Sequence, residues 1–581
     1  MKKVELPKKL TIAWLRKKYL KHELAPTEVI IEIIQRVKRD EGMNIWITSP
    51  NKDTIQPYLE RLQTLDIDSS PLWGIPFAIK DNIDLANVPT TAGCPEYAYT
   101  PTEHSTVVAR LIEAGAIPLG KTNLDQFATG LVGTRSPYGE AHNALRPELL
   151  SGGSSSGSAV AVARGHAVFS LGTDTAGSGR VPAALNDLVG LKPSLGAWPT
   201  KGVVPACASL DCVTVFSHSL EDAKKVDAVA RGIDEHDPWS RQLPFPVQKL
   251  PEKICLPREP LAFFGPFANE YRAAWEQAIS NLKQLNIPIE YIDDQLFSEA
   301  AAILYDGPYV AERWADIGGF IKEHPGSTFP VTEQVLRSAT LPKYDAASVF
   351  QSIHRLQVLK RKASNLLKDA VLVMPTVGGT WTRDQVREDP IKTNSDMGRY
   401  TNHCNLLDLC AIAVPAEEAA ANLPFGITFF AHSENEGLII GAAEAFMNRN
   451  KGQEKKIYVA VCGLHMRGFL FEKQMHEFGA VFVKEAITAE KYQFIKLPTS
   501  PAKPGLIKKQ TGGKAIELEI WEMPLHSFGE FAVLIPSPLG IGKVELQDGT
   551  EIPGFICEGY AADGSEDITD LGSWKKLEVK V

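Results

Sequence analysis

The chain has 581 residues, of which 44% are hydrophobic and 23% are charged, a composition typical of globular domains. Its formal net charge of −9 argues against a broad nucleic-acid-binding surface. No apolar run approaches the roughly 20 residues that cross a bilayer, and the first residues lack the apolar core of a signal peptide, so we expect no membrane partner.

Two helices are predicted first. Apolar residues recur at helical spacing over residues 10–18 and 27–39, and Pro26 suits the first turn of the second helix. We expect both helices to pack outside the core and assign them no chemistry.

An apolar strand is predicted next, over residues 75–79, and it is followed at once by Lys80. A lysine on such a strand is costly to bury unless it is paired or neutral. To be half neutral at pH 7 its pKa must fall from about 10.4 to about 7, and desolvation acts in that direction. Taken alone, Lys80 is more simply interpreted as a surface residue at a strand end. A nearby nucleophile would favour the opposite interpretation.

The following predicted strand, residues 114–120, leads into the segment KTNLDQFATG. We expect Thr122 and Asn123 to shape a cavity there. Asp125 fits a cavity role and a turn or cap role equally well. Arg135 is expected to form a structural pair rather than to meet an anionic substrate.

Two serine-bearing glycine loops flank one helix–strand unit in residues 149–182. The first loop is SGGSSSGS, a helix and a strand are predicted over 159–163 and 167–172, and the second loop is TDTAGSGR. Glycine lets backbone N–H groups point into a cavity, which is what a developing oxyanion needs. Serine needs a base to act as a nucleophile, and Lys80 is the upstream candidate. A phosphate loop is disfavoured because the Walker lysine is absent, and a flexible linker would not bracket apolar structure.

Four motifs, in this order, resemble the amidase signature family: GIPFAIKDN, GKTNLDQFATG, SGGSSSGSAVAVARG and GTDTAGSGRVPAA. The resemblance implies an α/β fold with a large mixed β-sheet covered by helices. It also implies a Ser–cis-Ser–Lys triad of Lys80, Ser154 and Ser178, with the two serines 24 positions apart. Lys80 would take a proton from Ser154, and Ser154 one from the nucleophile Ser178. Ser156 and Ala176 stand where the family usually has glycine, and both are small enough to fit.

The same resemblance places an oxyanion hole in the second loop. Its donors would be the backbone N–H groups of Thr175, Ala176, Gly177 and Ser178. Asp174 is expected to accept backbone hydrogen bonds and Arg180 to support the loop. His218 offers a rival Ser/His/Asp triad, which we disfavour because Lys80 already supplies a base.

Eight cysteines are scattered along the chain without a C-x-x-C pair, which predicts free thiols in a cytoplasmic protein and no zinc site. Cys207 and Cys212 lie near the predicted site, and we interpret both as small buried hydrophobic residues.

A helical segment over residues 301–320 is interrupted at Gly307 and Pro308. With SLDCVTVF before it and RYTNHCNLLDLCAIAVPA after it, the segment resembles the allophanate hydrolase branch of the family. That resemblance implies that Tyr305 and Arg313 hold a substrate carboxylate, and arginine suits this role because it forms a bidentate fork. The alternative is an interhelical salt bridge of Arg313 with a packed Tyr305.

A charged, turn-like segment at residues 451–456 predicts a linker between a catalytic domain, residues 1–450, and a second domain, residues 457–581. Short alternating strands predict a small β-rich α+β domain, with a hairpin turn at QDGT, residues 547–550. This block resembles the allophanate hydrolase C-terminal domain, itself similar to γ-glutamyl-cyclotransferase-like folds. In that family the domain is implicated in decarboxylating the first product. His465, in the segment G-x-H-x-x-G, is the candidate residue, with a packed loop histidine as the equal alternative.

Together these resemblances imply hydrolysis of allophanate (urea-1-carboxylate) to ammonia and carbon dioxide in urea degradation, with no metal or organic cofactor. They imply a cytoplasmic homodimer acting on a small molecule, and they leave open a functional link to a separate urea carboxylase. Two other functions stay open. One is a broader amidase or one component of an amidotransferase, against which the β-rich second domain argues. The other is a non-catalytic scaffold, against which the intact triad argues.

Overall fold

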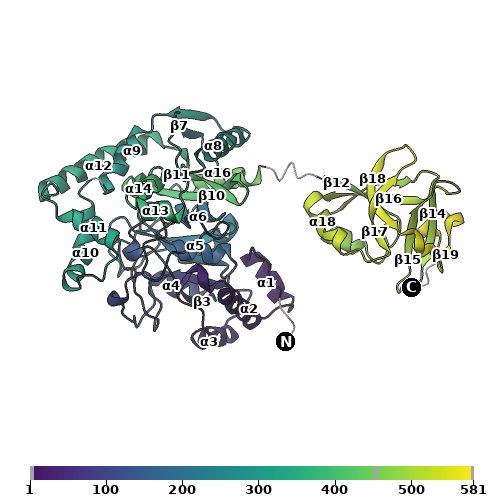
Figure 1. Cartoon of the computed structure of the whole chain (residues 1–581), viewed down its shortest axis with the longest axis horizontal. Coiled ribbons are helices and arrows are strands. Elements are labelled where there is room, and N and C mark those ends of the chain that lie inside the picture. The colour runs from purple at the N-terminus through teal and green to yellow at the C-terminus, as the bar shows by residue number, and fades with distance from the viewer. Residues whose placement is uncertain (1–4, 306, 450–455, 578–581) are drawn as a thin grey trace. The chain divides into compact units, whose positions relative to one another are not determined.

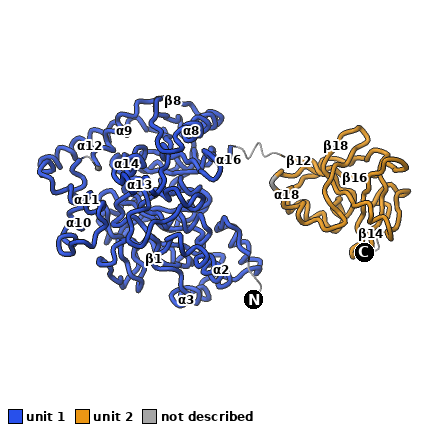
Figure 2. The backbone as a smooth tube through the Cα atoms, in the orientation of Figure 1, with its two compact units in different colours: residues 1–449 blue, residues 450–581 orange. Residues whose placement is uncertain are grey.

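A computed structural model describes residues 5–305, 307–449 and 456–577. The chain forms two compact units, Met1–Arg449 and Asn450–Val581, coloured separately in Figure 2. Of the linker predicted at 451–456, only Lys456 belongs to the described part, where it begins strand β12 (Lys456–Val461).

A mixed sheet runs through the first unit and has 11 strands over the described residues. In order across the sheet these are β1 (Trp46–Thr48), β3 (Ile117–Thr122), β2 (Pro76–Lys80), β4 (Phe169–Asp174), β6 (Cys212–Ser217), β5 (Val189–Lys192), β10 (Leu409–Ala420), β11 (Leu423–His432), β9 (Ala370–Pro375), β7 (Lys253–Pro257) and β8 (Ile289–Ile292).

The parallel strands β2, β3 and β4 determine where the chemistry is placed. Strand β2 pairs in parallel with both β3 and β4. Every residue of the three strands is buried, as expected for a sheet covered on both faces. Because the carboxyl ends of parallel strands lie at one edge, Lys80 at the end of β2 lies beside the end of β4 and the second glycine loop.

Helices surround this sheet (Figure 1). In chain order they are α1 (Ile12–Leu20), α2 (Pro26–Arg39), α3 (Lys52–Arg61), α4 (Thr106–Glu113), α5 (Ser156–Ala163), α6 (Val181–Leu185), α7 (Leu220–Ala230), α8 (Ala268–Lys283), α9 (Gln295–Tyr305), α10 (Val310–Glu323), α11 (Pro330–Arg337), α12 (Ala346–Leu366), α13 (Arg383–Glu388), α14 (Lys392–Gly398), α15 (His403–Leu406) and α16 (Glu436–Asn448).

Helix α5 follows the first glycine loop and is buried along its whole length. Its small side chains let it pack closely on β2, β3 and β4. The predicted helix start and helix break are also observed: Pro26 is the first residue of α2, and Gly307 and Pro308 lie between α9 and α10. The predicted α/β fold with a large mixed sheet is therefore confirmed.

The second unit is β-rich, as predicted. Its five-stranded sheet has the order β13 (Val481–Ile487), β16 (Glu517–Pro524), β12, β18 (Glu551–Cys557) and β17 (Leu539–Glu545). A three-stranded sheet contains β15 (Lys503–Lys508), β14 (Tyr492–Leu497) and β19 (Glu566–Asp567). Two helices accompany them, α17 (Glu472–Glu477) and α18 (Leu525–Val533). The QDGT segment turns between the antiparallel strands β17 and β18, where the Leu546 N–H donates to the Thr550 carbonyl oxygen at 2.8 Å.

All eight cysteines are buried and free, as expected. Among the helices in the described part of the chain, none combines the length and apolarity needed to cross a bilayer.

Candidate active site

Lys80 is completely buried at the end of β2, and its amine has two hydroxyl neighbours. Nζ lies 2.7 Å from Ser154 Oγ and 2.7 Å from Thr173 Oγ1. Burial lowers the pKa of Lys80 to about 7, against the opposing attraction of the Asp125, Asp211 and Asp174 carboxylates. This is the pKa that a lysine base needs at neutral pH.

Ser154 is held in the loop before α5 and is fully buried. The Gly153–Ser154 peptide bond is cis. The Ser154 carbonyl oxygen accepts a hydrogen bond from the Asp125 N–H at 3.1 Å. The hydroxyl therefore faces Lys80 from a backbone that is itself anchored.

Thr173 is a site residue that the sequence reasoning missed. Its hydroxyl accepts from Lys80 and, at 3.3 Å, from Asn82 Nδ2. Its carbonyl oxygen accepts from Ser155 Oγ at 3.1 Å, which ties β4 to the first serine loop. The sequence did contain one signal for Thr173: it is a hydroxyl residue near the carboxyl end of a predicted strand, and that strand could pair in parallel with the strand that ends at Lys80.

Asp174 braces the second loop, as predicted. Its carboxylate accepts from the N–H groups of Gly177 at 2.8 Å and Gly179 at 3.0 Å. Arg180 donates to both carboxylate oxygens, at 2.9 and 3.0 Å, and to the Thr401 carbonyl oxygen. Although burial opposes it, the Arg180 guanidinium holds the pKa of Asp174 below its usual value. The pair fixes the loop that contains Ser178.

One predicted oxyanion donor is already engaged. The Gly177 N–H points at Asp174, so it is not available to a substrate, and we remove it from the candidate donors. The N–H groups of Thr175, Ala176 and Ser178 make no hydrogen bond to any residue the structure describes. Gly177 is needed for another reason: its φ is +140°, and a Cβ would lie 2.3 Å from Thr401 Oγ1.

Asp125 and Arg135 have structural contacts. Asp125 accepts from the Arg135 N–H at 2.9 Å and from the N–H groups of residues 132–133, so it acts as a turn residue. The Arg135 guanidinium donates to the carbonyl oxygens of Thr129 and Pro390. Both side chains stabilise the wall of the site.

His218 does not support the rival triad. Its Nε2 lies 2.9 Å from the Val162 carbonyl oxygen, and burial lowers its pKa to about 4. Among the hydrogen bonds of the described part, none joins His218 to a serine or a carboxylate.

Arg313 lies on α10 with 2% of its surface exposed, and its Nη1 donates to Thr129 Oγ1 at 3.1 Å. Burial raises the pKa of Asp211 to about 6, and the positive charge of Arg313 is among the effects that oppose this rise. The Asp211 carboxyl group accepts from the Thr175 hydroxyl of the second loop. Arg313 is thus electrostatically linked to that loop. Tyr305 is the last residue of α9, and its side chain lies outside the described residues.

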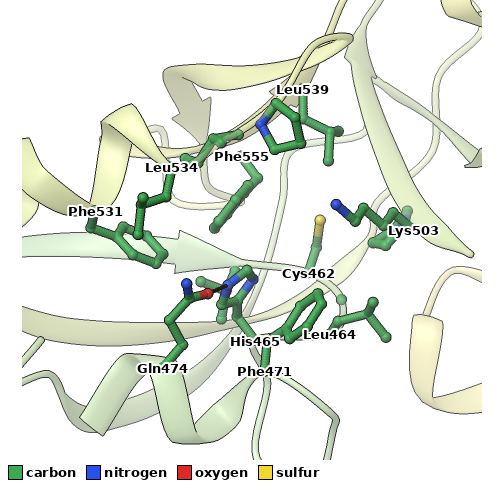
Figure 3. Close-up of a pocket in the computed structure, with 15 residues that line it drawn as sticks. Cys462, Leu464, His465, Phe471, Gln474, Lys503, Phe531, Leu534, Leu539 and Phe555 are labelled. Carbon is green, nitrogen blue, oxygen red and sulfur yellow. Dashed lines mark hydrogen bonds between the residues drawn. The ribbon is translucent and has the colours of Figure 1, made fainter. Parts of the chain in front are cut away.

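A second candidate site lies in the C-terminal unit (Figure 3). A cavity of about 200 Å³ is lined largely by apolar and aromatic side chains, with His465, Gln474 and Lys503 among its polar groups. His465 stacks on Phe555 at 5.0 Å between ring centroids, and its Nε2 lies 2.8 Å from Gln474 Oε1. Burial lowers the pKa of His465, and Lys503 adds to that effect. An amide oxygen only accepts, so Nε2 carries the hydrogen and Nδ1 is left as an acceptor.

Residues 28–440 match the family described as amidase. The chain belongs to the amidase family. Residues 457–578 match a second family, the allophanate hydrolase C-terminal domain. The family resemblance expected from the motifs is confirmed for both units.

Several amidase-family relatives are similar along this chain. The urea amidolyase of Lachancea kluyveri is 40% identical over 91% of this chain, which covers 31% of that protein, so the chain spans about a third of this relative. A solved Kluyveromyces lactis allophanate hydrolase is 36% identical with a TM-score of 0.72, over 97% of this chain and 98% of that one. A glutamyl-tRNA(Gln) amidotransferase component from Lactobacillus acidophilus is 31% identical over 76% of this chain and 96% of its own length.

Proposed function

We propose that this amidase-family chain hydrolyses the terminal amide of allophanate and releases ammonia. The observation that carries the chemistry is the buried Lys80 amine, 2.7 Å from Ser154 Oγ and with a pKa lowered to about 7. The substrate is supported by the similarity to an allophanate hydrolase over 97% of the chain.

The first step is attack of Ser178 Oγ on the terminal amide carbon. Ser154 takes the Ser178 proton while Lys80 takes the proton of Ser154, so a neutral amine becomes an ammonium ion. The N–H groups of Thr175, Ala176 and Ser178 hold the negative oxygen that forms. The proton then returns through Ser154 to the departing nitrogen, which leaves as ammonia.

Water then attacks the acyl-enzyme with the same groups acting as base, and N-carboxycarbamate is released. The substrate carboxylate is held by Arg313, with Tyr305 as the second anchor expected from the resemblance. A guanidinium binds a carboxylate better than a neutral amide, because the planar fork of N–H donors forms two charge-assisted hydrogen bonds with the two carboxylate oxygens.

The second step belongs to the C-terminal cavity. N-carboxycarbamate carries two carboxylates, and Lys503 and His465 are polar groups there that can meet them. Loss of one carbon dioxide with uptake of one proton leaves carbamate, and carbamate takes up a second proton and breaks down to ammonia and a second carbon dioxide. A dianion beside His465 favours its imidazolium form, which can supply that proton.

The supply of allophanate belongs to the same proposal. Relatives named urea amidolyase extend well beyond the length of this chain, and we place a urea carboxylase reaction upstream of this one. The homodimer and the cytoplasmic location expected from the resemblance remain predictions, and light scattering of the purified chain tests the first of them.

The test compares ammonia release from allophanate, biuret, malonamide and urea at equal concentrations. We expect allophanate to have the highest kcat/KM by a wide margin. Equal rates on all four substrates would remove the allophanate assignment while leaving a general amidase.

A further inference from the structure

Helix α10 is connected to the predicted oxyanion loop through a short segment between them. This segment, residues 206–211, which we call the bridge loop, is held from both sides by carboxylates. Glu312 of α10 binds its middle, and Asp211 at its end binds the second glycine loop.

Glu312 makes three hydrogen bonds to the bridge loop. Its Oε1 accepts from the Ser209 N–H at 2.7 Å, and its Oε2 accepts from Ser209 Oγ at 2.8 Å and from Cys207 Sγ at 3.0 Å. Hydrogen bonds to a charged acceptor are among the stronger ones in proteins. Glu312 therefore fixes both the position and the rotation of α10 at the residue next to Arg313.

Asp211 closes the other side of the bridge loop. One of its oxygens accepts from the N–H groups of Ala206 at 2.7 Å and Cys207 at 3.1 Å, and the other accepts from the Thr175 hydroxyl. Asn405 Nδ2 adds a second link, donating to the carbonyl oxygens of Leu210 and Asp174 at 2.7 Å each. The segment that receives Glu312 is thus continuous with the loop that contains Ser178.

We propose that Glu312 is a positioning residue that gives the enzyme its preference for carboxylated over neutral amides. It holds Arg313 at a fixed position relative to the second glycine loop. A substrate whose carboxylate is bound by the Arg313 guanidinium then has its amide carbon placed at Ser178. A neutral amide makes no use of this alignment. The inference rests on the proposed role of Arg313 in substrate binding and extends it to a residue that does not touch substrate.

The test is the substitution Glu312→Gln, which replaces the Glu312 carboxylate with an amide of similar size. The variant is assayed on allophanate and on biuret, the neutral diamide that corresponds to allophanate. We expect kcat/KM for allophanate to fall about tenfold or more, mainly through KM, and kcat/KM for biuret to change less than about threefold. Ser209→Ala, which removes one of the three bonds, should give a smaller change in the same direction. Glu323→Gln, at the exposed end of the same helix, is the matched control and should leave kcat/KM unchanged for both substrates.

If Glu312 has a purely structural role, Glu312→Gln reduces kcat/KM for both substrates by the same factor. That result, or an unchanged kcat/KM for both substrates, would overturn the inference. Equal thermal unfolding midpoints of the variants exclude a folding defect. If the wild-type chain does not act on allophanate, the proposed function is wrong, but the inference about Glu312 can still be tested. The malonamate and malonamide pair, one carboxylated and one neutral, then still measures whether Glu312 sets the preference.

Discussion

Lys80 and Lys121 are both fully buried on the neighbouring parallel strands β2 and β3, yet they differ in their partners. Lys121 forms an ion pair with Asp81 at 3.1 Å, while no carboxylate in the described ranges lies within ion-pairing distance of Lys80. Burial lowers the pKa of both lysines, and at Lys121 the adjoining Asp81 carboxylate opposes that shift through direct contact. The site thus contains one structural lysine and one lysine suited to take a proton.

The first prediction concerns the pH dependence of the reaction. Only the neutral Lys80 amine accepts the Ser154 proton, and its pKa is lowered to about 7. We therefore expect kcat/KM for ammonia release from allophanate to rise with pH, with a midpoint near 7, and then to level off. Initial rates at constant ionic strength between pH 6 and 9 measure this. A flat profile over that range would exclude a lysine base with this pKa.

The second prediction is that Lys80→Met stabilises the fold. In the wild type the pKa of Lys80 falls from 10.5 to about 7 on folding, so between these values the unfolded state binds more protons. Wild-type stability therefore rises with pH across this window, and below it the buried lysine costs about 4–5 kcal/mol. Losing two hydrogen bonds offsets part of the gain, which leaves Lys80→Met about 2–3 kcal/mol more stable at pH 7.

Urea denaturation at pH 7 and pH 9.5 checks this difference. The gap between Lys80→Met and the wild type should shrink at the higher pH, because the wild-type penalty is then largely relieved. A variant less stable than the wild type at pH 7 would mean that Lys80 is charged and compensated in the folded protein.

Thr173 gives the third prediction. Thr173→Val keeps the shape but leaves the buried donors of Lys80 and Asn82 without their shared acceptor. A donor left unsatisfied costs about 1–3 kcal/mol, so kcat/KM for allophanate should fall roughly 10- to 100-fold. Thr173→Ser restores the hydroxyl and should recover most of the activity. If the serine variant is as poor as the valine variant, then packing of the methyl group, not the hydrogen bonds, explains the loss.

Part of this site could be predicted from the sequence, because the signal for those residues lies in short stretches of the chain. Lys80, Ser154 and the loop around Ser178 lie in motifs whose glycines and strand pattern are visible in short windows. The contacts of Thr173 with Lys80 and of Glu312 with Ser209 join residues 93 and 103 positions apart, and periodicity has no information about such pairs. The loss of Gly177 as an oxyanion donor depends on where the Asp174 carboxylate points, which is a matter of side-chain geometry.

The C-terminal cavity gives the fourth prediction. His465→Ala should leave the release of the first ammonia unchanged and delay the release of carbon dioxide, because N-carboxycarbamate accumulates. Stopped-flow detection of both products measures this delay. His476→Ala is the control, since His476 is exposed and pairs with Glu472 on the surface of α17. Equal product kinetics in the wild type and His465→Ala would restrict His465 to packing.

The central claim is that Lys80 is the base of an allophanate-hydrolysing serine site, and one measurement tests it most directly. Ammonia release from allophanate by Lys80→Met, at pH 8 and with the fold verified by circular dichroism, should be about 10²- to 10⁴-fold slower than in the wild type. A folded Lys80→Met chain that releases ammonia within a few-fold of the wild-type rate would contradict the account.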